Sequence, residues 1–187
     1  MMHVFILYLH TLLPFHNEVP SPEVCLSAEE AKLVTLINKY RKSKRLNSIP
    51  VSKKLTLVAQ LHAKDLAQFY DFDPNGPCNP HSWSDQGNWS SCCYTNDHKE
   101  AKCMWNKPKE ISEYESHGYE IAYYSSAGAT AEEGIKGWKK SAGHNPLLVN
   151  SGMWKKVEWQ ALGVGIYKEY AVVWFGQLGD EEQPCYN

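Results

Sequence analysis

Six cysteines constrain this chain more than any other feature of its sequence. Two stand near the ends of the main part of the chain, Cys25 and Cys185, and four lie in the middle: Cys78, Cys92, Cys93 and Cys103. No two of them have the two-residue gap of a zinc knuckle, whereas an even number of cysteines is typical of disulfides formed in an oxidising compartment. The sequence leaves the connectivity open, and we expect Cys25 to pair with Cys185 and tie the two ends together.

The size and charge of the chain limit what it can be. Its 187 residues suit one domain with a sizeable core, and 43% hydrophobic and 21% charged residues are ordinary for a globular protein. The formal net charge is −2, and the scattered cations from Lys39 to Arg45 are typical of the solvated end of a helix. Nucleic acid is therefore not expected as a partner.

The start of the chain resembles a targeting segment rather than part of the fold. An apolar run from Val4 to Phe15 is too short to span a bilayer as a helix. We expect residues 1–20 to be a signal peptide, residues 21–187 to form a single domain, and no transmembrane segment to be present. Secretion also fits Asn88-Trp89-Ser90, which is an N-glycosylation sequon.

Three helices are predicted from capping residues and apolar periodicity. Ser27 and Thr130 each stand three residues before a Glu, which is the pattern of a capping box, and Ser52 precedes another helical stretch. The first helix is expected to end between Asn47 and Pro50, and the third near Lys140. In the second helix, His62 is interpreted as a histidine at the edge of the core rather than a ligand.

The strands are predicted from two runs rich in β-branched and aromatic residues. Residues 162–166 and 171–175 are expected to form a hairpin that turns at Lys168-Glu169. Between the second and third helices, residues 71–113 are rich in Pro, Asn, Ser, Cys and Trp and lack a sustained period. They are expected to form a long loop held by the four middle cysteines.

Two distant histidines are the best candidates for a functional site. His81 lies in Pro80-His81-Ser82-Trp83 and His144 in Gly143-His144-Asn145-Pro146, with Glu120 between them in the sequence. Two imidazoles and a carboxylate suit a divalent metal such as Zn²⁺, or general acid/base work. Alternatively, both histidines serve only to hydrogen-bond loop backbone.

Two further histidines bear on this prediction. His117 stands three residues before Glu120, so the two side chains would pair with each other if residues 114–120 were helical. His98 lies beside Asn96 and Asp97 and is expected at the surface.

Known hydrolase motifs are missing from the sequence. The cysteines are expected to be oxidised, there is no Gly-x-Ser-x-Gly elbow, and there is no His-Glu-x-x-His helix. Ser141, close to His144 in the sequence, is expected to cap or hydrogen-bond the loop. We therefore predict no catalytic residue and no organic cofactor.

The final third of the chain carries a family resemblance. Residues 137–148 contain a bacterial-type Trp-x-x-Ser-x-Gly-His segment, and a Gly-x-Gly strand and an aromatic strand ending in Phe175-Gly176-Gln177 follow it. Earlier, residues 58–69 contain an Ala-x-x-His-Ala pattern, and Pro80-His81-Ser82 precedes the middle cysteines. Over residues 27–177 the chain resembles the CAP superfamily of cysteine-rich secretory proteins, insect venom antigens and plant pathogenesis-related proteins.

This resemblance implies an α+β fold and a cavity. The fold is a three-layer α-β-α sandwich with a mainly antiparallel central sheet, and the cavity would be lined by His81, Glu120 and His144 as metal ligands. The chain departs from the family pattern around Glu120, where Tyr119 and Ile121 replace the Gly and Asn of a Gly-Glu-Asn segment. It also has Ser141 where many animal and plant members have a second Glu.

The function expected from these observations is binding rather than catalysis. The leading hypothesis is a secreted CAP protein whose cavity holds a divalent metal, with a lipid or sterol in an adjoining groove. One alternative is a metal-dependent hydrolase or protease in which Glu120 acts as general base. Another is a module that contacts an extracellular protein or glycan through the Trp- and Tyr-rich loop between Trp83 and Trp105.

Overall fold

The computed structural model describes residues 23–70, 73 and 75–187, so the expected signal peptide lies outside the described residues. Within this part of the chain, three strands form an antiparallel sheet in the order β2-β4-β3. Their bounds are Gly118–Tyr124 for β2, Ala161–Tyr167 for β3 and Tyr170–Gly176 for β4. The β3–β4 pair is the hairpin predicted from the sequence.

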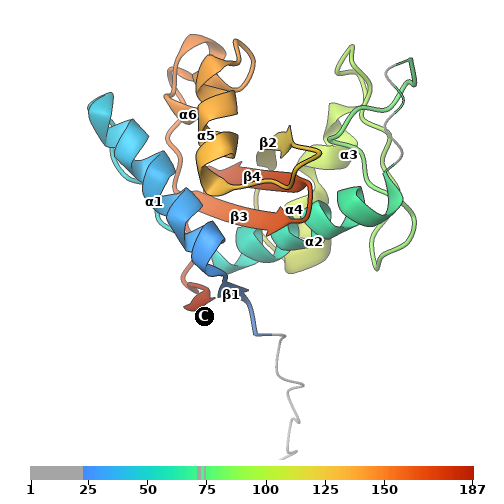
Figure 1. The fold of residues 1–187 in the computed structure, drawn as a ribbon, viewed down its shortest axis with the longest axis horizontal. Coiled ribbons are helices and arrows are strands. Elements are labelled where there is room, and N and C mark those ends of the chain that lie inside the picture. Colours follow the sequence, from blue (N-terminus) through green and yellow to red (C-terminus); the bar gives the residue numbers. More distant parts are fainter. Residues whose placement is uncertain (1–22, 71–72, 74) are drawn as a thin grey trace, which may run out of the picture.

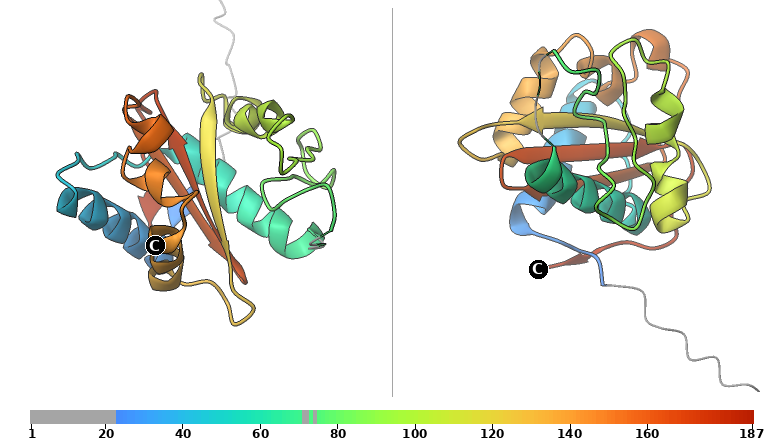
Figure 2. Two further views of the ribbon diagram at one scale, coloured as in Figure 1. Left: turned by 90° about the horizontal axis from the view of Figure 1, so that it is seen from above. Right: turned by 90° about the vertical axis from the view of Figure 1, so that its right-hand side faces the viewer.

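Helices cover both faces of this sheet, which gives the predicted three-layer α-β-α sandwich (Figures 1 and 2). One face carries α2 (Lys53–Phe69), with α3 (Ala101–Trp105) and α4 (Lys107–Ser112) beside it. The other carries α1 (Ala28–Ser43), α5 (Ala131–Lys140) and α6 (Asn145–Leu148), followed by the 3₁₀ turn η1 (Gly152–Trp154). None of the helices in the described part of the chain is long and apolar enough to cross a membrane.

The capping residues start the three predicted helices where expected. The Ser27 hydroxyl accepts from the amide of Glu30, whose carboxylate in turn accepts from the amide of Ser27 at 2.8 Å, so the capping box is complete. Ser52 and Thr130 likewise accept from the third amide of their helices. The first helix ends at Ser43, however, a few residues before the expected boundary.

Two predictions about the middle of the chain are wrong. The expected loop over residues 71–113 contains α3 and α4, and α4 begins with Pro108 in its first turn, where the missing N–H breaks no helical hydrogen bond. Residues 118–120 belong to β2 rather than to a helix. Side chains three apart on a strand point to opposite faces, so the chain cannot pair His117 with Glu120 in the helical manner considered above.

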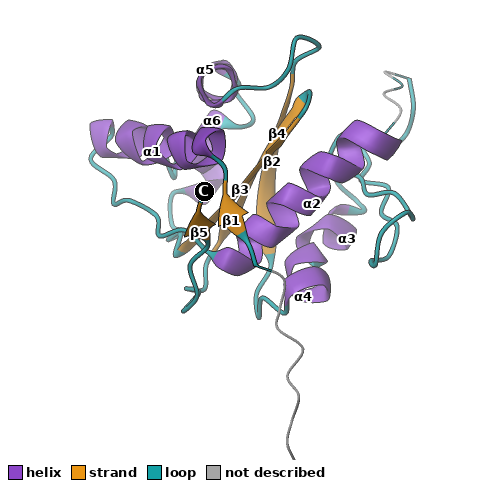
Figure 3. Cartoon of the chain, turned by 60° about the horizontal axis from the view of Figure 1, so that its bottom comes forward, coloured by secondary structure: helices purple, strands orange, loops and turns teal. Residues whose placement is uncertain are grey.

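Three disulfides pair all six cysteines. Cys25–Cys185 confirms the expected link between the ends of the domain, and it joins the short parallel strands β1 (Cys25–Leu26) and β5 (Cys185–Tyr186) (Figure 3). Cys78–Cys93 and Cys92–Cys103 cross-link the middle loop, and the second of them fastens this loop to α3. The loop is thereby held beside α2 with little help from regular secondary structure.

The contact between α2 and β3 depends on two glycines. Gly163 and Gly165 lie on the face of β3 that meets α2, because alternate residues of a strand share a face. A Cβ atom at Gly163 would lie 2.1 Å from the carbonyl carbon of Leu55, and one at Gly165 would lie 2.3 Å from the carbonyl oxygen of Ala59. The helix backbone therefore rests directly on the strand.

We predict that Gly165→Ala lowers the free energy of unfolding by about 1–3 kcal/mol, because the added methyl group meets backbone that cannot move aside. Chemical denaturation checks this. Gly179→Ala is the matched control, since no atom lies within 4 Å of a Cβ built there. Equal midpoints for the two variants would contradict the close packing of α2 on β3.

Candidate binding cleft

The three predicted site residues line one cavity of about 490 Å³. His81 comes from the disulfide-bonded loop, Glu120 from the edge strand β2, and His144 from the turn between α5 and α6. Segments far apart in the sequence thus meet at one end of the sheet. The structure brings together the residues that sequence analysis selected.

Glu120 is a buried carboxylate held between two imidazoles. Its Oε2 lies 2.5 Å from Nδ1 of His62, and its Oε1 lies 2.7 Å from Nδ1 of His81. Burial by itself would raise the pKa of this carboxyl group, but the charge of His62 and the hydrogen bonds from His62 and His81 outweigh burial and hold the pKa below its ordinary value. Glu120 is therefore ionised.

His62 is the partner of Glu120 that sequence analysis missed. Its Nε2 lies 2.9 Å from the carbonyl oxygen of Ser82, while its Nδ1 faces the Glu120 carboxylate. An ionised Glu120 and the Ser82 carbonyl both only accept hydrogen bonds, so this geometry assigns a proton to each ring nitrogen, which makes the ring an imidazolium. The ring is fully buried and stacks on Trp83, with centroids 4.1 Å apart and planes at 6°, an arrangement that favours a cation.

The sequence contained a signal for this role. The Ala-x-x-His-Ala pattern placed His62 on the apolar face of its helix. A histidine with no exposed surface needs partners for both nitrogens. Those partners come from β2 and from the disulfide-bonded loop, which the sequence alone does not bring near α2.

The contact with Glu120 fixes the tautomer of His81. Because the carboxylate accepts from Nδ1, the lone pair of the neutral ring is on Nε2, the atom available to a ligand in the cavity. The loop holds this geometry through its backbone: the amide of His81 donates to Asn79 Oδ1 at 3.0 Å, and the amide of Tyr94 donates to the Ser82 hydroxyl at 2.8 Å.

His144 lies on the turn after α5 and lines the same cavity as His81. Its amide donates to the Ser141 hydroxyl at 3.3 Å, which confirms the predicted hydrogen-bonding role of Ser141. The next residue, Asn145, accepts from the Tyr40 hydroxyl at 2.9 Å, so α1 anchors the turn. Burial lowers the pKa of His144, and His81 acts in the same direction while Glu120 opposes it. His144 therefore presents a neutral imidazole at neutral pH.

The cavity also has an apolar side. Tyr119 of β2 packs against Trp154 of η1 with ring centroids 4.9 Å apart, and against Trp105 of α3 at 5.8 Å. These three rings line the cavity together with Met153, which is 84% exposed. The cleft thus combines an imidazole pair with an aromatic wall.

Two other histidines of the described residues, His98 and His117, lie outside the contacts of Glu120. His117 is exposed and packs near Trp105, and it does not pair with Glu120, because residues 118–120 form a strand rather than the helix on which that pairing depended. His98 is exposed, as expected, and its Nδ1 lies 2.9 Å from the Tyr94 hydroxyl at the edge of the cavity.

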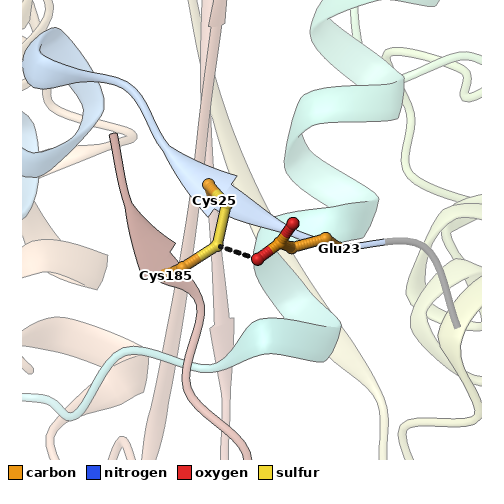
Figure 4. A group of neighbouring side chains, drawn as sticks. All are labelled: Glu23, Cys25 and Cys185. Carbon is orange, nitrogen blue, oxygen red and sulfur yellow. Dashed lines mark hydrogen bonds between the residues drawn. A yellow bond between two sulfur atoms is a disulfide. The ribbon is translucent and has the colours of Figure 1, made fainter. Parts of the chain in front are cut away.

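Only one trio of side chains in the described part of the chain has all its potential metal-binding atoms within 4.8 Å of one another: Glu23, Cys25 and Cys185. Figure 4 shows that the two sulfur atoms of this trio are joined in a disulfide, so it offers no thiolate. The donor atoms of His81, Glu120 and His144 do not all meet within that distance. In this geometry the Glu120 carboxylate contacts Nδ1 of His81 and supports that ring, rather than meeting both imidazoles at a common point.

Solved structures of similar fold come from bacterial proteins. An extracellular protein containing an SCP domain from Bacillus anthracis aligns with a TM-score of 0.55 and 18% identity over 80% of this chain. A cysteine-rich secretory protein from Staphylococcus aureus gives 0.51 and 15% over the same share. This chain covers only 40% and 38% of those two proteins.

A third structure is closer in size. An outer surface protein from Borrelia burgdorferi aligns with a TM-score of 0.54 and 17% identity over 80% of this chain and 93% of its own length. No curated protein sequence matches the chain. The family model described as the cysteine-rich secretory protein family, CAP, matches residues 34–171, well over half of the sequence. Together with the α-β-α sandwich and the histidine cleft, this match shows that the chain belongs to the CAP family.

Proposed function

We propose that this protein is secreted and acts by binding, with a divalent cation held at the imidazole pair of the cleft. Three disulfides suit an oxidising, extracellular environment. The Bacillus anthracis and Borrelia burgdorferi proteins of similar fold are described as extracellular and as an outer surface protein.

One observation carries the cation proposal: an ionised, buried Glu120 orients His81 so that Nε2 is the free ring nitrogen. A carboxylate behind an imidazole is the usual support of a histidine that binds a metal, because it fixes the tautomer and increases the basicity of the ligand. His144, kept neutral by burial, supplies a second lone pair at the same cavity. Neutral imidazoles suit Zn²⁺, with water completing the coordination.

In this proposal Glu120 supports the ligands rather than acting as a base. Both of its oxygens already accept hydrogen bonds from His62 and His81. A general base must be within reach of the proton that it removes. The arrangement therefore favours the binding role over the hydrolase.

Isothermal titration with Zn²⁺ tests the cation site. We expect the intact protein to give one saturable heat and the His81→Ala/His144→Ala variant to lose it. His117→Ala, which changes an exposed histidine outside the cleft, is the control and should keep it. Circular dichroism establishes that all three proteins are folded. Equal heats for the double variant and the intact protein would contradict the site.

The same titration has an expected pH dependence. Metal binding requires neutral rings, so it weakens as the pH falls. Because the pKa of His144 lies below the ordinary 6.5, this ring still offers its lone pair at pH 6.5. Protonation of His144 should therefore weaken Zn²⁺ binding only below pH 6.5.

We further propose that the aromatic wall holds the apolar part of a lipid-like ligand, such as a fatty acid or sterol. The support is the cluster of Trp105, Tyr119 and Trp154 on one side of the cavity, with the exposed Met153 at the same place. Sites for small molecules are mostly apolar with a few polar groups that fix orientation, and the imidazole pair supplies such groups.

Titration with a fluorescent fatty acid tests the apolar side. Met153→Asp places a charge on the wall without disturbing the core, and we expect it to weaken binding by about tenfold, or about 1.4 kcal/mol. Leu178→Asp, another exposed apolar residue that does not line the cavity, is the control. The proposal fails if both variants bind the probe as the intact protein does.

A further inference from the structure

Lysines from two distant segments of the chain meet at one tyrosine ring. Lys44, directly after α1, and Lys139 of α5 place their ammonium groups 5.5 and 4.3 Å from the centroid of the same Tyr40 ring. The two helices pack against each other on the same side of the sheet (Figure 1). We define the basic face as the exposed lysines at their C-terminal ends: Lys39, Lys42, Lys44, Lys136, Lys139 and Lys140.

The two helices run in the same direction, which separates their charges. At their N-terminal ends, Lys32 pairs with Glu132 and the amide of Ala131 donates to the Glu29 carboxylate at 3.0 Å. The C-terminal ends have no such partners, because the sequence contains no carboxylate from residue 31 to 64 or from residue 134 to 157. Within the described part of the chain, no lysine of the basic face forms an ion pair. The C-terminal halves of α1 and α5 thus carry unpaired cations in a protein whose net charge is −2.

Helix stability explains part of this pattern but not all of it. Cations in the last turn stabilise a helix by about 0.3–1 kcal/mol through its macrodipole, and Lys42, Lys139 and Lys140 lie there. The effect fades beyond that turn, and Lys39 and Lys136 stand four residues before the ends of their helices. Their ammonium groups add positive charge to the basic face but do not stabilise their helices through the macrodipole.

We propose that the basic face binds a sulfated polysaccharide. Unpaired, exposed ammonium groups on two helices that pack together suit a linear polymer that carries a fixed anion on each unit. Three disulfides suit the oxidising extracellular space, which is where the proposed function places the protein and where such polysaccharides occur. A membrane surface is less suited, because docked helices combine cations with exposed apolar residues, and the described part of the chain has no exposed large apolar residue on α1 or α5. This site is separate from the cleft and does not depend on it.

Heparin affinity chromatography with salt elution tests the proposal. We expect the intact protein, despite its negative net charge, to be retained at about 0.15 M salt. A Lys39→Gln/Lys136→Gln/Lys139→Gln variant should elute at lower salt, and its affinity for heparin should fall by at least about tenfold. The control replaces three exposed lysines on other segments, Lys64, Lys102 and Lys168, by Gln, which changes the net charge equally. It should elute with the intact protein.

Three results would overturn the proposal. The first is an intact protein that is not retained on heparin. The second is equal weakening in the two triple variants, which would show that net charge rather than the basic face controls binding. The third is lysine-dependent sedimentation with vesicles containing phosphatidylserine in the absence of heparin binding, which would assign the face to a membrane.

Discussion

The buried ion pair between His62 and Glu120 is the interaction on which the rest of this structure depends. It joins helix α2 to the edge strand β2, and the second nitrogen of His62 joins both to the disulfide-bonded loop through Ser82. Breaking one partner of such a pair leaves an uncompensated buried charge, which is strongly destabilising. The same carboxylate orients His81, so the interaction that fastens three segments together also prepares the cleft.

The surrounding fold fixes the positions of the side chains that form the cleft. Glycines on β3 allow α2 to rest on the sheet, which sets the depth at which His62 meets Glu120. Disulfides hold the loop that carries His81, while hydrogen bonds from α1 and Ser141 hold the turn that carries His144. Each side of the cleft is therefore positioned by contacts that do not involve a ligand.

Sequence analysis succeeded where the signal was local and failed where it depended on tertiary contacts. The caps at Ser27 and Ser52 and the hairpin after residue 160 follow from short-range patterns, whereas the fold class is what the family resemblance implies. The imidazolium state of His62 does not, because both of its partners lie in other segments. The short helices α3 and α4 were missed because cross-linking and packing, rather than periodicity, hold them. The cations from Lys39 to Arg45 are visible in the sequence, but their proximity to Lys139 is not, because it depends on the packing of α1 against α5.

The central claim is that His62 is a buried cation and that its partner Glu120 leaves Nε2 of His81 free. Nitrogen NMR of the histidine rings at neutral pH measures this directly, because protonated and bare ring nitrogens resonate at different frequencies. The structure predicts protons on both nitrogens of His62 and a proton on Nδ1 alone in His81. A neutral His62, or a proton on Nε2 of His81, would contradict the account.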